Sequence, residues 1–129
     1  SWGGAGVFWG KNVVTCYIRP QRYTKEFVDA NDTFTLSFYG PECKNALNLC
    51  GTVSGRDRDK ISEAGLTPYF TEGTAAFEEA NLIFVCRKIY QDDMPYENFI
   101  AKENDAKYYP NKDYHTMYIA EIVKILVAE

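Results

Sequence analysis

The sequence predicts a mainly β fold of the α+β class, an antiparallel barrel that carries a few short helices. Residues 33–39 alternate the apolar Phe34, Leu36 and Phe38 with small polar residues, which is the period-two pattern of a strand with one buried face. Residues 80–90 and 114–127 form two long β-rich runs. The helix signals between these runs are short, so strands dominate the expected order of elements.

The first thirty residues are expected to hold a strand and a helix. Residues 12–19 are rich in β-branched and aromatic side chains, which predicts a largely buried strand. Turn material is predicted before it by four glycines, Gly3, Gly4, Gly6 and Gly10. Thr24 has the residue type of a helix N-cap, and Phe27 and Val28 follow with helical spacing, so a short helix is expected from about residue 24.

Two more short helices are expected between residues 41 and 65. The first has Pro41 at its start and Gly51 just after its last apolar residues. The second begins near Ser54, which forms a weak capping box with Asp57, and ends at Gly65. A turn region near residues 67–68 then leads to the two long β-rich runs, which are separated by a polar loop.

Composition predicts a single domain, residues 1–129, with 46% hydrophobic and 25% charged residues. The net charge of −4 argues against nucleic-acid binding, which depends on many basic contacts, but a small phosphorylated ligand needs only a local cluster of cations. No membrane-spanning stretch and no secretory signal are present. A cytoplasmic protein is therefore expected, with no metal site and with free thiols at four cysteines that lack C-x-x-C spacing, Cys16, Cys43, Cys50 and Cys86.

The turn Arg19-Pro20-Gln21-Arg22-Tyr23-Thr24 is the main candidate site. It places two arginines at the expected start of a helix. The first amides of a helix have no internal partner and carry partial positive charge, so an anion gains both hydrogen bonds and a favourable field there. This pattern predicts a phosphate cradle. A surface connection between strand and helix, with solvated arginines, is an equally good explanation of the local pattern alone.

Arg56 and Lys60 are a second candidate, because they lie four residues apart on the helix expected from Ser54. Their side chains would share one face and converge on an anion together with Ser54 and the Gly55 backbone. A solvated helix with exposed ion pairs, each contributing about 0–1 kcal/mol, is the more common explanation of such spacing.

His115 and Trp2 are weaker candidates. His115 shares strand parity with apolar residues, so a packed histidine is favoured over a hydrogen-bond donor at a pocket rim. With a single histidine and no localised partners, hydrolytic catalysis is not predicted. Trp2 lies beside Ser1 and two glycines that leave room for a flat ring, although core packing explains it equally simply.

The order of these segments resembles the flavin reductase-like proteins, particularly the flavoredoxin-like branch. The similarity rests on Ser1-Trp2-Gly3-Gly4, Gly6-Val7, the turn of residues 19–24, the strand of residues 32–38, Ser54-Gly55-Arg56-Asp57 and His115-Thr116-Met117-Tyr118-Ile119. The resemblance implies an FMN-binding split β-barrel and a homodimer with the flavin near the subunit interface. It also implies an additional N-terminal strand and a polar segment before Ser1, which this sequence does not contain.

Carried over by position, the resemblance implies a specific set of cofactor contacts. Ser1 and Trp2 would lie near the flavin rings, and the phosphate and ribityl chain would be held by Arg19, Gln21, Arg22, Tyr23 and Thr24 on one side and by Ser54, Gly55, Arg56 and Lys60 on the other. His115 would contact the nicotinamide or another electron partner.

The expected function is an FMN-binding oxidoreductase that passes reducing equivalents from NAD(P)H through FMN to an acceptor. The sequence has no G-x-G-x-x-G fingerprint, which disfavours a dedicated nicotinamide domain but not transient stacking of nicotinamide on an exposed flavin. The alternatives are an electron carrier that works with another protein without NAD(P)H, a non-redox FMN-binding module, and a barrel used only for protein interaction.

Overall fold

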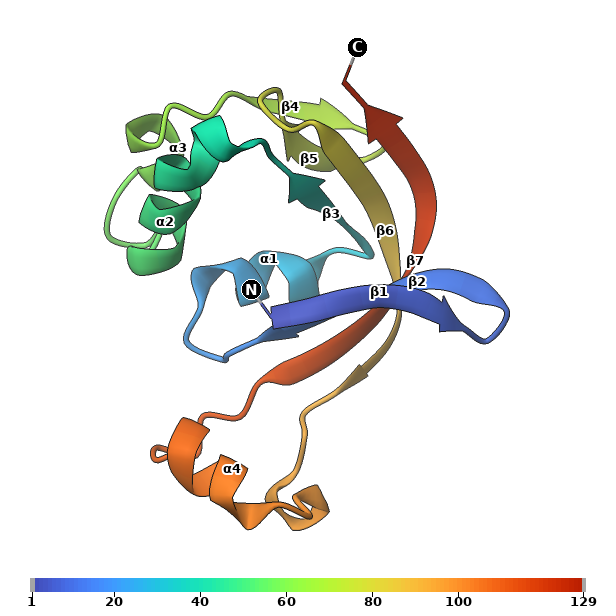
Figure 1. Cartoon of the computed structure of the whole chain (residues 1–129), viewed down its shortest axis with the longest axis vertical. Coiled ribbons are helices and arrows are strands. Elements are labelled where there is room, and N and C mark those ends of the chain that lie inside the picture. Colours follow the sequence, from blue (N-terminus) through green and yellow to red (C-terminus); the bar gives the residue numbers. More distant parts are fainter. Residues whose placement is uncertain (1, 129) are drawn as a thin grey trace.

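The computed structural model describes residues 2–128 and contains a strongly curved antiparallel sheet (Figure 1). Within these residues the sheet has five strands in the order β1-β2-β7-β6-β3. The strands are β1 (Trp2–Phe8), β2 (Lys11–Ile18), β3 (Thr33–Phe38), β6 (Leu82–Asp92) and β7 (Thr116–Val127). A separate hairpin is formed by β4 (Pro68–Thr71) and β5 (Thr74–Phe77). The mainly β fold with short helices is confirmed.

The helices lie around this sheet rather than in a layer of their own. Helix α1 (Tyr23–Ala30) lies within the curve of the sheet, α2 (Lys44–Thr52) and α3 (Lys60–Glu63) lie together on one side, and α4 (Lys102–Tyr108) lies at the far end from the C-terminus (Figure 1). Two short 3-10 turns, η1 (Pro41–Cys43) and η2 (Tyr96–Asn98), precede α2 and α4. None of the helices found in residues 2–128 is both long and apolar enough to cross a membrane.

The long strands β6 and β7 form the centre of the core. Val14, Cys86 and Ala120 are fully buried at this centre. Register shifts in the pairing of β6 with β7, between Val85 and Cys86 and again between Lys88 and Tyr90, bend the pair. The bend curves the sheet, so that its inner face can cover α1.

Tyr118 ties α1 to the sheet. Its side chain is fully buried, and its hydroxyl donates to Asp29 Oδ1 at 2.5 Å. Lys25 Nζ donates to the other oxygen of the same carboxylate at 2.6 Å. Burial and the bond to Asp29 raise the pKa of Tyr118 to about 12, so the hydroxyl keeps its proton as a donor. The helix that begins the candidate site is thereby fixed to the core.

The cysteines are buried or partly buried side chains. All four are free, and Cys16 and Cys86 are buried. Burial raises the pKa of the Cys16 thiol to about 11 and that of Cys86 to about 12. Both thiols therefore stay protonated and pack as small apolar groups.

Three sequence expectations are wrong in detail. The glycine-rich residues 2–8 form strand β1 rather than turn material, because their backbone pairs with β2 from Trp2↔Tyr17 to Phe8↔Lys11. The helix expected from Ser54 is a turn followed by the short α3, which Asp59 caps through its side chain. The segment after β6 was expected to be a polar loop, because it contains prolines and acidic residues. It contains η2 and α4 instead.

Candidate functional site

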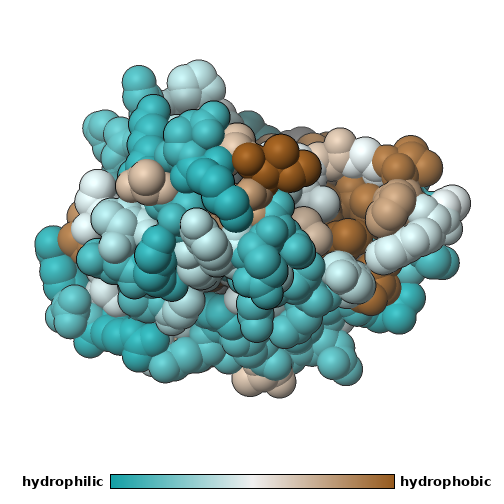
Figure 2. All heavy atoms as spheres, turned by 90° about the horizontal axis from the view of Figure 1, so that it is seen from below, coloured by the Kyte–Doolittle hydropathy of each residue, from teal (hydrophilic) through white to brown (hydrophobic). Residues whose placement is uncertain are grey.

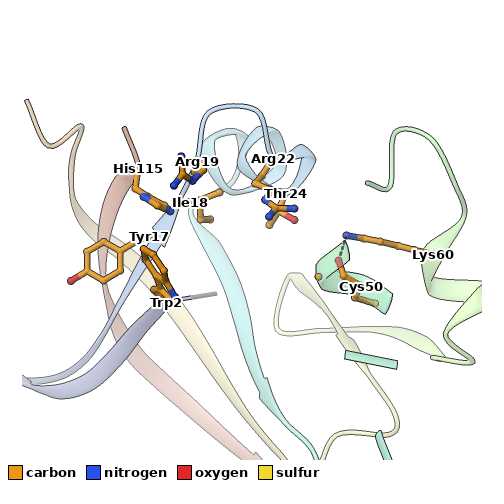
Figure 3. Close-up of a pocket in the computed structure, with 10 residues that line it drawn as sticks. Trp2, Tyr17, Ile18, Arg19, Arg22, Thr24, Cys50, Lys60 and His115 are labelled. Atoms are coloured by element: carbon orange, nitrogen blue, oxygen red, sulfur yellow. Dashed lines mark hydrogen bonds between the residues drawn. The ribbon is translucent and has the colours of Figure 1, made fainter. Parts of the chain in front are cut away.

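Two adjoining pockets lie where β2 leads into α1, facing α2 and α3. The first has a volume of about 390 Å³ and is lined by the residues of Figure 3, which include Trp2, Tyr17, Cys50 and His115. The second has a volume of about 490 Å³ and adds Gln21, Tyr23, Ser54 and Asp57. Both are lined by Arg19, Arg22, Thr24 and Lys60. The structure therefore brings both predicted basic segments to one place.

Arg19 is held rigidly at the junction of the pockets. Its guanidinium donates to Asp113 Oδ2 at 2.9 Å and to the Tyr108 carbonyl at 2.8 Å. Gln21 Nε2 donates to the same Asp113 oxygen at 2.7 Å. These two donors, Gln21 first, lower the pKa of Asp113, so its carboxylate stays ionised and orients both side chains. No local pattern predicts a role for Asp113, because it lies more than ninety residues away from both partners in the sequence.

Arg22 places a cation at the start of α1. The Arg22 N–H donates to the Arg19 carbonyl at 3.1 Å, which closes a β-turn with Pro20 at its second position. In the described residues 2–128, the Arg22 side chain has no hydrogen bond or ion pair. A charged side chain that lines two pockets without a partner is suited to an anionic ligand.

The expectation that Thr24 is the N-cap of α1 is wrong. The cap residue is Arg22, whose extended backbone (φ −73°, ψ 132°) starts the helix at Tyr23 and makes Thr24 the second helical residue. Within the described residues 2–128, no side chain caps this helix start. The Lys25 amide donates to the Arg22 carbonyl at 3.1 Å, so within residues 2–128 the amides of Tyr23 and Thr24 remain open to a ligand, which favours an anion site at this turn.

Lys60 reaches the same pockets from α3. Its Nζ donates to the carbonyls of Cys50 at 2.9 Å and Val53 at 3.3 Å, at the end of α2. An ammonium group has three donors, so one remains for the pocket (Figure 3). Asp57 is the one acidic residue among the described residues that line the second pocket, against three cations. The local charge is therefore positive although the chain is acidic overall.

Arg56 and Gly55 do not line either pocket, so the expected shared face of Arg56 and Lys60 is wrong. Because the amides of Asp57 and Arg58 donate to the Ser54 carbonyl, a turn separates Arg56 from the helix that carries Lys60. The Arg56 guanidinium donates to Glu26 at 2.9 Å and covers the Tyr23 ring at 4.7 Å. Gly55 packs against the same ring, because a Cβ added at Gly55 would lie 3.2 Å from Cδ2 of Tyr23. Ser1, also predicted, lies outside the described residues.

Trp2 and His115 form an aromatic wall of the first pocket. Their ring centroids lie 5.4 Å apart with planes at 34°, and the Tyr108 ring meets Trp2 edge-on at 5.6 Å. His115 lies just before β7, only 8% exposed, and its Nδ1 is 2.5 Å from the Tyr109 hydroxyl. The sequence favoured a packed histidine over one at a pocket rim. In the structure His115 is packed and also lines the pocket.

His115 is neutral at neutral pH. Burial is the main cause that lowers its pKa, and the positive charge of Arg19 acts in the same direction. A neutral imidazole has one donor and one acceptor nitrogen. We assign the Tyr109 hydroxyl as the donor to Nδ1, which leaves the Nε2 proton directed to the pocket side.

The arrangement can hold a molecule with an anionic group at one end and a flat ring at the other. Arg22, Lys60 and the open amides of α1 suit a phosphate, and the Trp2 ring suits a planar group. Sequence reasoning missed Tyr17, Cys50 and Asp57 as lining residues. Strand pairing explains Tyr17, which is the register partner of Trp2, whereas only the tertiary fold brings Cys50 to the pocket.

Known structures share this architecture. Flavoredoxin from Methanosarcina acetivorans is 18% identical with a TM-score of 0.76, over 99% of this chain and 59% of its own. Flavoredoxin of Desulfovibrio vulgaris (Miyazaki F) is 22% identical with a TM-score of 0.74, over 99% and 59%. An FMN-binding protein from Thermus thermophilus, crystallised with p-hydroxybenzaldehyde, is 19% identical with a TM-score of 0.73, over 99% and 61%. The chain thus spans about three fifths of the length of these proteins.

The sequence itself matches one family model. No match was found among the sequences of curated proteins. The model of the flavin reductase like domain matches residues 11–129, which include Arg19, Arg22, Thr24, Lys60 and His115. The first four of these residues were predicted to contact a phosphate and line both pockets, and His115, predicted to contact an electron partner, lines the first. The chain belongs to the family of the flavin reductase like domain.

Proposed function

We propose that this protein binds FMN in the two adjoining pockets and passes reducing equivalents from NAD(P)H through it to an acceptor. The observation that carries the proposal is the convergence of Arg19, Arg22, Thr24 and Lys60 on both pockets. Membership of the flavin reductase like domain family supports the redox chemistry. Flavin binding by structural neighbours, such as the Thermus thermophilus protein, supports the choice of FMN.

The residues that line the two pockets have the chemistry to hold FMN. Arg22, the third donor of Lys60 and the uncapped amides of α1 would hold the phosphate. Gln21, Tyr23 and Ser54 line the second pocket and would border the ribityl chain. Trp2 would lie beside the rings. Arg56 and Gly55 are left out of the proposed site, because Arg56 is paired with Glu26 and covers Tyr23.

FMN, when bound, would accept a hydride from NAD(P)H and release electrons to an acceptor. The protein needs no nucleophile of its own for this chemistry. Arg19, fixed by Asp113, adds positive charge beside the site, where negative charge on a ligand is stabilised. His115 offers its Nε2 proton as a neutral donor, and Trp2 lines one side of the first pocket.

Flavin loading and reduction test the proposal directly. The protein is mixed with FMN, desalted and scanned in the visible range; we expect close to one flavin per chain. The loaded protein is then mixed anaerobically with NADH or NADPH, and bleaching by either supports the reductase. Colourless protein after desalting would overturn FMN binding. Loaded protein that only a protein donor reduces would instead support an electron carrier with a protein partner.

We also propose that the protein is a homodimer. Strand β1 lies at an edge of the sheet, all seven of its residues are exposed, and Val7 is 74% exposed. On β7, Ile125 and Val127 are also exposed, and Val7 and Ile125 line a common groove. Figure 2 shows hydrophobic surface gathered at one side of the molecule, whereas most of that face is hydrophilic. An apolar edge of this kind favours association with another chain.

Sedimentation velocity tests the dimer. We expect a mass twice that of one chain, and a monomer when Val7 and Ile125 are both replaced by lysine. Ile100→Lys is the matched control, because Ile100 is fully exposed but lies beside α4, away from the groove. A monomeric parent protein, or a dimer that survives the double substitution, would contradict this interface.

A further inference from the structure

Tyr109 and His115 form a buried, hydrogen-bonded pair behind the first pocket. The Tyr109 hydroxyl lies 2.5 Å from Nδ1 of His115, and the two residues are only 5% and 8% exposed. His115 lines the first pocket, whereas Tyr109 does not. Figure 3 shows the His115 ring close to Trp2 and Arg19 at the wall of this pocket. The hydroxyl is therefore connected to the pocket through the imidazole.

The pair is held by the turn that leads from α4 into β7. The Tyr109 carbonyl accepts from the Lys112 N–H at 3.1 Å, and Lys112 has a left-handed backbone with φ of 58°. The chain thereby folds back, and His115 meets Tyr109 from six residues further along. Arg19 binds Asp113 within the same turn and lies over the Tyr109 ring. The hydroxyl and Nδ1 are thus held at a fixed separation.

The charges around His115 keep its ring neutral at rest. Burial lowers the pKa of His115, Arg19 and Arg22 act in the same direction, and Asp113 acts against them. The proton at Nε2 therefore belongs to a neutral imidazole rather than to an imidazolium. If that proton is given away, a replacement has to come from the group bonded at Nδ1, which is the Tyr109 hydroxyl.

A neutral imidazole is a very weak acid unless its other nitrogen gains a proton. Loss of the Nε2 proton alone would leave an imidazolate, which is a strongly disfavoured anion. When the Tyr109 proton moves to Nδ1 as Nε2 releases its own, the His115 ring stays neutral and the negative charge lies on a phenolate, the anion of a much stronger acid. The Arg19 guanidinium, 5.0 Å from the centroid of the Tyr109 ring, would stabilise this charge.

We propose that Tyr109 is the proton source of the site and that His115 delivers the proton to an acceptor in the first pocket. The inference rests on the proposed function, because passing a hydride equivalent from NAD(P)H through FMN to an uncharged acceptor consumes one further proton. That second proton leaves Nε2 of His115, while the Tyr109 proton moves to Nδ1 and leaves a phenolate. Once the product has left, water protonates Nε2 and the Nδ1 proton returns to Tyr109.

Nitrogen NMR of the imidazole tests the pair in the cofactor-free protein. The chain has one histidine, so a single pair of nitrogen signals reports its tautomer. We expect Nε2 to carry the proton in the parent protein, and a larger share of the Nδ1–H tautomer in Tyr109→Phe, which keeps the ring but removes the hydroxyl. Tyr108→Phe is the matched control, because the Tyr108 hydroxyl has no hydrogen bond within residues 2–128. It should leave the tautomer unchanged.

Two oxidants test whether the proton is used. FMN-loaded protein is reduced with light and EDTA and then mixed anaerobically with p-benzoquinone or with ferricyanide. The quinone takes two electrons and two protons, whereas ferricyanide takes only electrons. Tyr109→Phe is expected to slow reoxidation by the quinone about tenfold or more, because a positioned acid is lost, and to change reoxidation by ferricyanide less than about twofold. Tyr108→Phe, which leaves the pair intact, should change either rate less than about twofold.

The outcomes separate the proton source from the cofactor. FMN retention is measured in the same samples by equilibrium dialysis. A proton on Nδ1 in the parent protein, an unchanged quinone rate in Tyr109→Phe, or equal slowing with both oxidants would overturn the proton source. The first of these results needs no variant, so the proposal can fail even if Tyr109→Phe does not fold. Protein that binds no FMN but shows the expected tautomers would support the pair and contradict the cofactor.

Discussion

Arg22→Ala is expected to weaken FMN binding by about 10- to 150-fold, the range for loss of one hydrogen bond between charged groups. Arg22 lines both pockets, and no group within residues 2–128 competes for its charge. It caps α1 only through its backbone, because no side-chain cap bond is present. The substitution should therefore leave the helix intact. The measurement is a fluorescence titration of FMN, with thermal unfolding as the check on the fold.

Arg56→Ala is the matched control. It removes the same charge from a residue that the sequence assigned to the site but that the structure pairs with Glu26. FMN affinity should change by less than about threefold, because a charge held outside the pocket is screened by solvent. Riboflavin, which lacks the phosphate, should bind equally well to the parent protein and to Arg22→Ala. A similar loss for both arginine variants would contradict the assignment, since it would indicate a general effect of charge.

The sequence could predict the part of the site that is formed by neighbouring residues of the chain. The residues from Arg19 to Thr24 are contiguous, and a turn that leads from a strand into a helix positions them whatever the rest of the chain does. Even the error at Thr24 is small, because moving the helix start by a residue or two leaves the same amides at the same end. Local chemistry was sufficient for this part.

The other half depends on distant contacts. Lys60 was selected for its spacing from Arg56 on a helix that does not exist, yet it reaches the pockets because α3 packs beside α2. Asp113 fixes Arg19 and Gln21 from a loop near the end of the chain. The spacing of residues in a single sequence does not predict contacts between residues so far apart in the chain. The cavity lined by the rings of Trp2, Phe99, Tyr108 and Tyr109 has the same origin, because these rings converge only when α4 folds back toward β1.

The fold was predictable where side chains alternate or form long β-rich runs. Strands β3, β6 and β7 lie within one or two residues of the expected ranges. Strand β1 was missed because its glycines carry no β propensity, and backbone pairing with β2 determines its conformation. One of these glycines has a steric role that propensity does not reveal.

Gly3→Ala is expected to lower the free energy of unfolding by about 1–3 kcal/mol, the usual cost of forcing a methyl group into packed structure. A Cβ at Gly3 would lie 2.2 Å from the Thr15 carbonyl oxygen, on the strand to which β1 is paired. That atom belongs to the backbone, so β1 would have to move rather than a side chain. The adjacent Trp2 would move with it, which should shift its indole N–H signal and weaken FMN binding. Chemical denaturation measures the first effect and NMR the second.

Gly4→Ala tests the steric argument at the next residue. Nothing lies within 4 Å of a Cβ at Gly4, so alanine should fit there, and the loss of backbone freedom in the unfolded chain should leave stability unchanged or raise it by up to about 1 kcal/mol. Opposite effects at two neighbouring glycines would show that close approach of β1 to β2 fixes the position of Trp2. Equal effects would show instead that β1 is held loosely, and Trp2 would then not be a fixed wall of the first pocket.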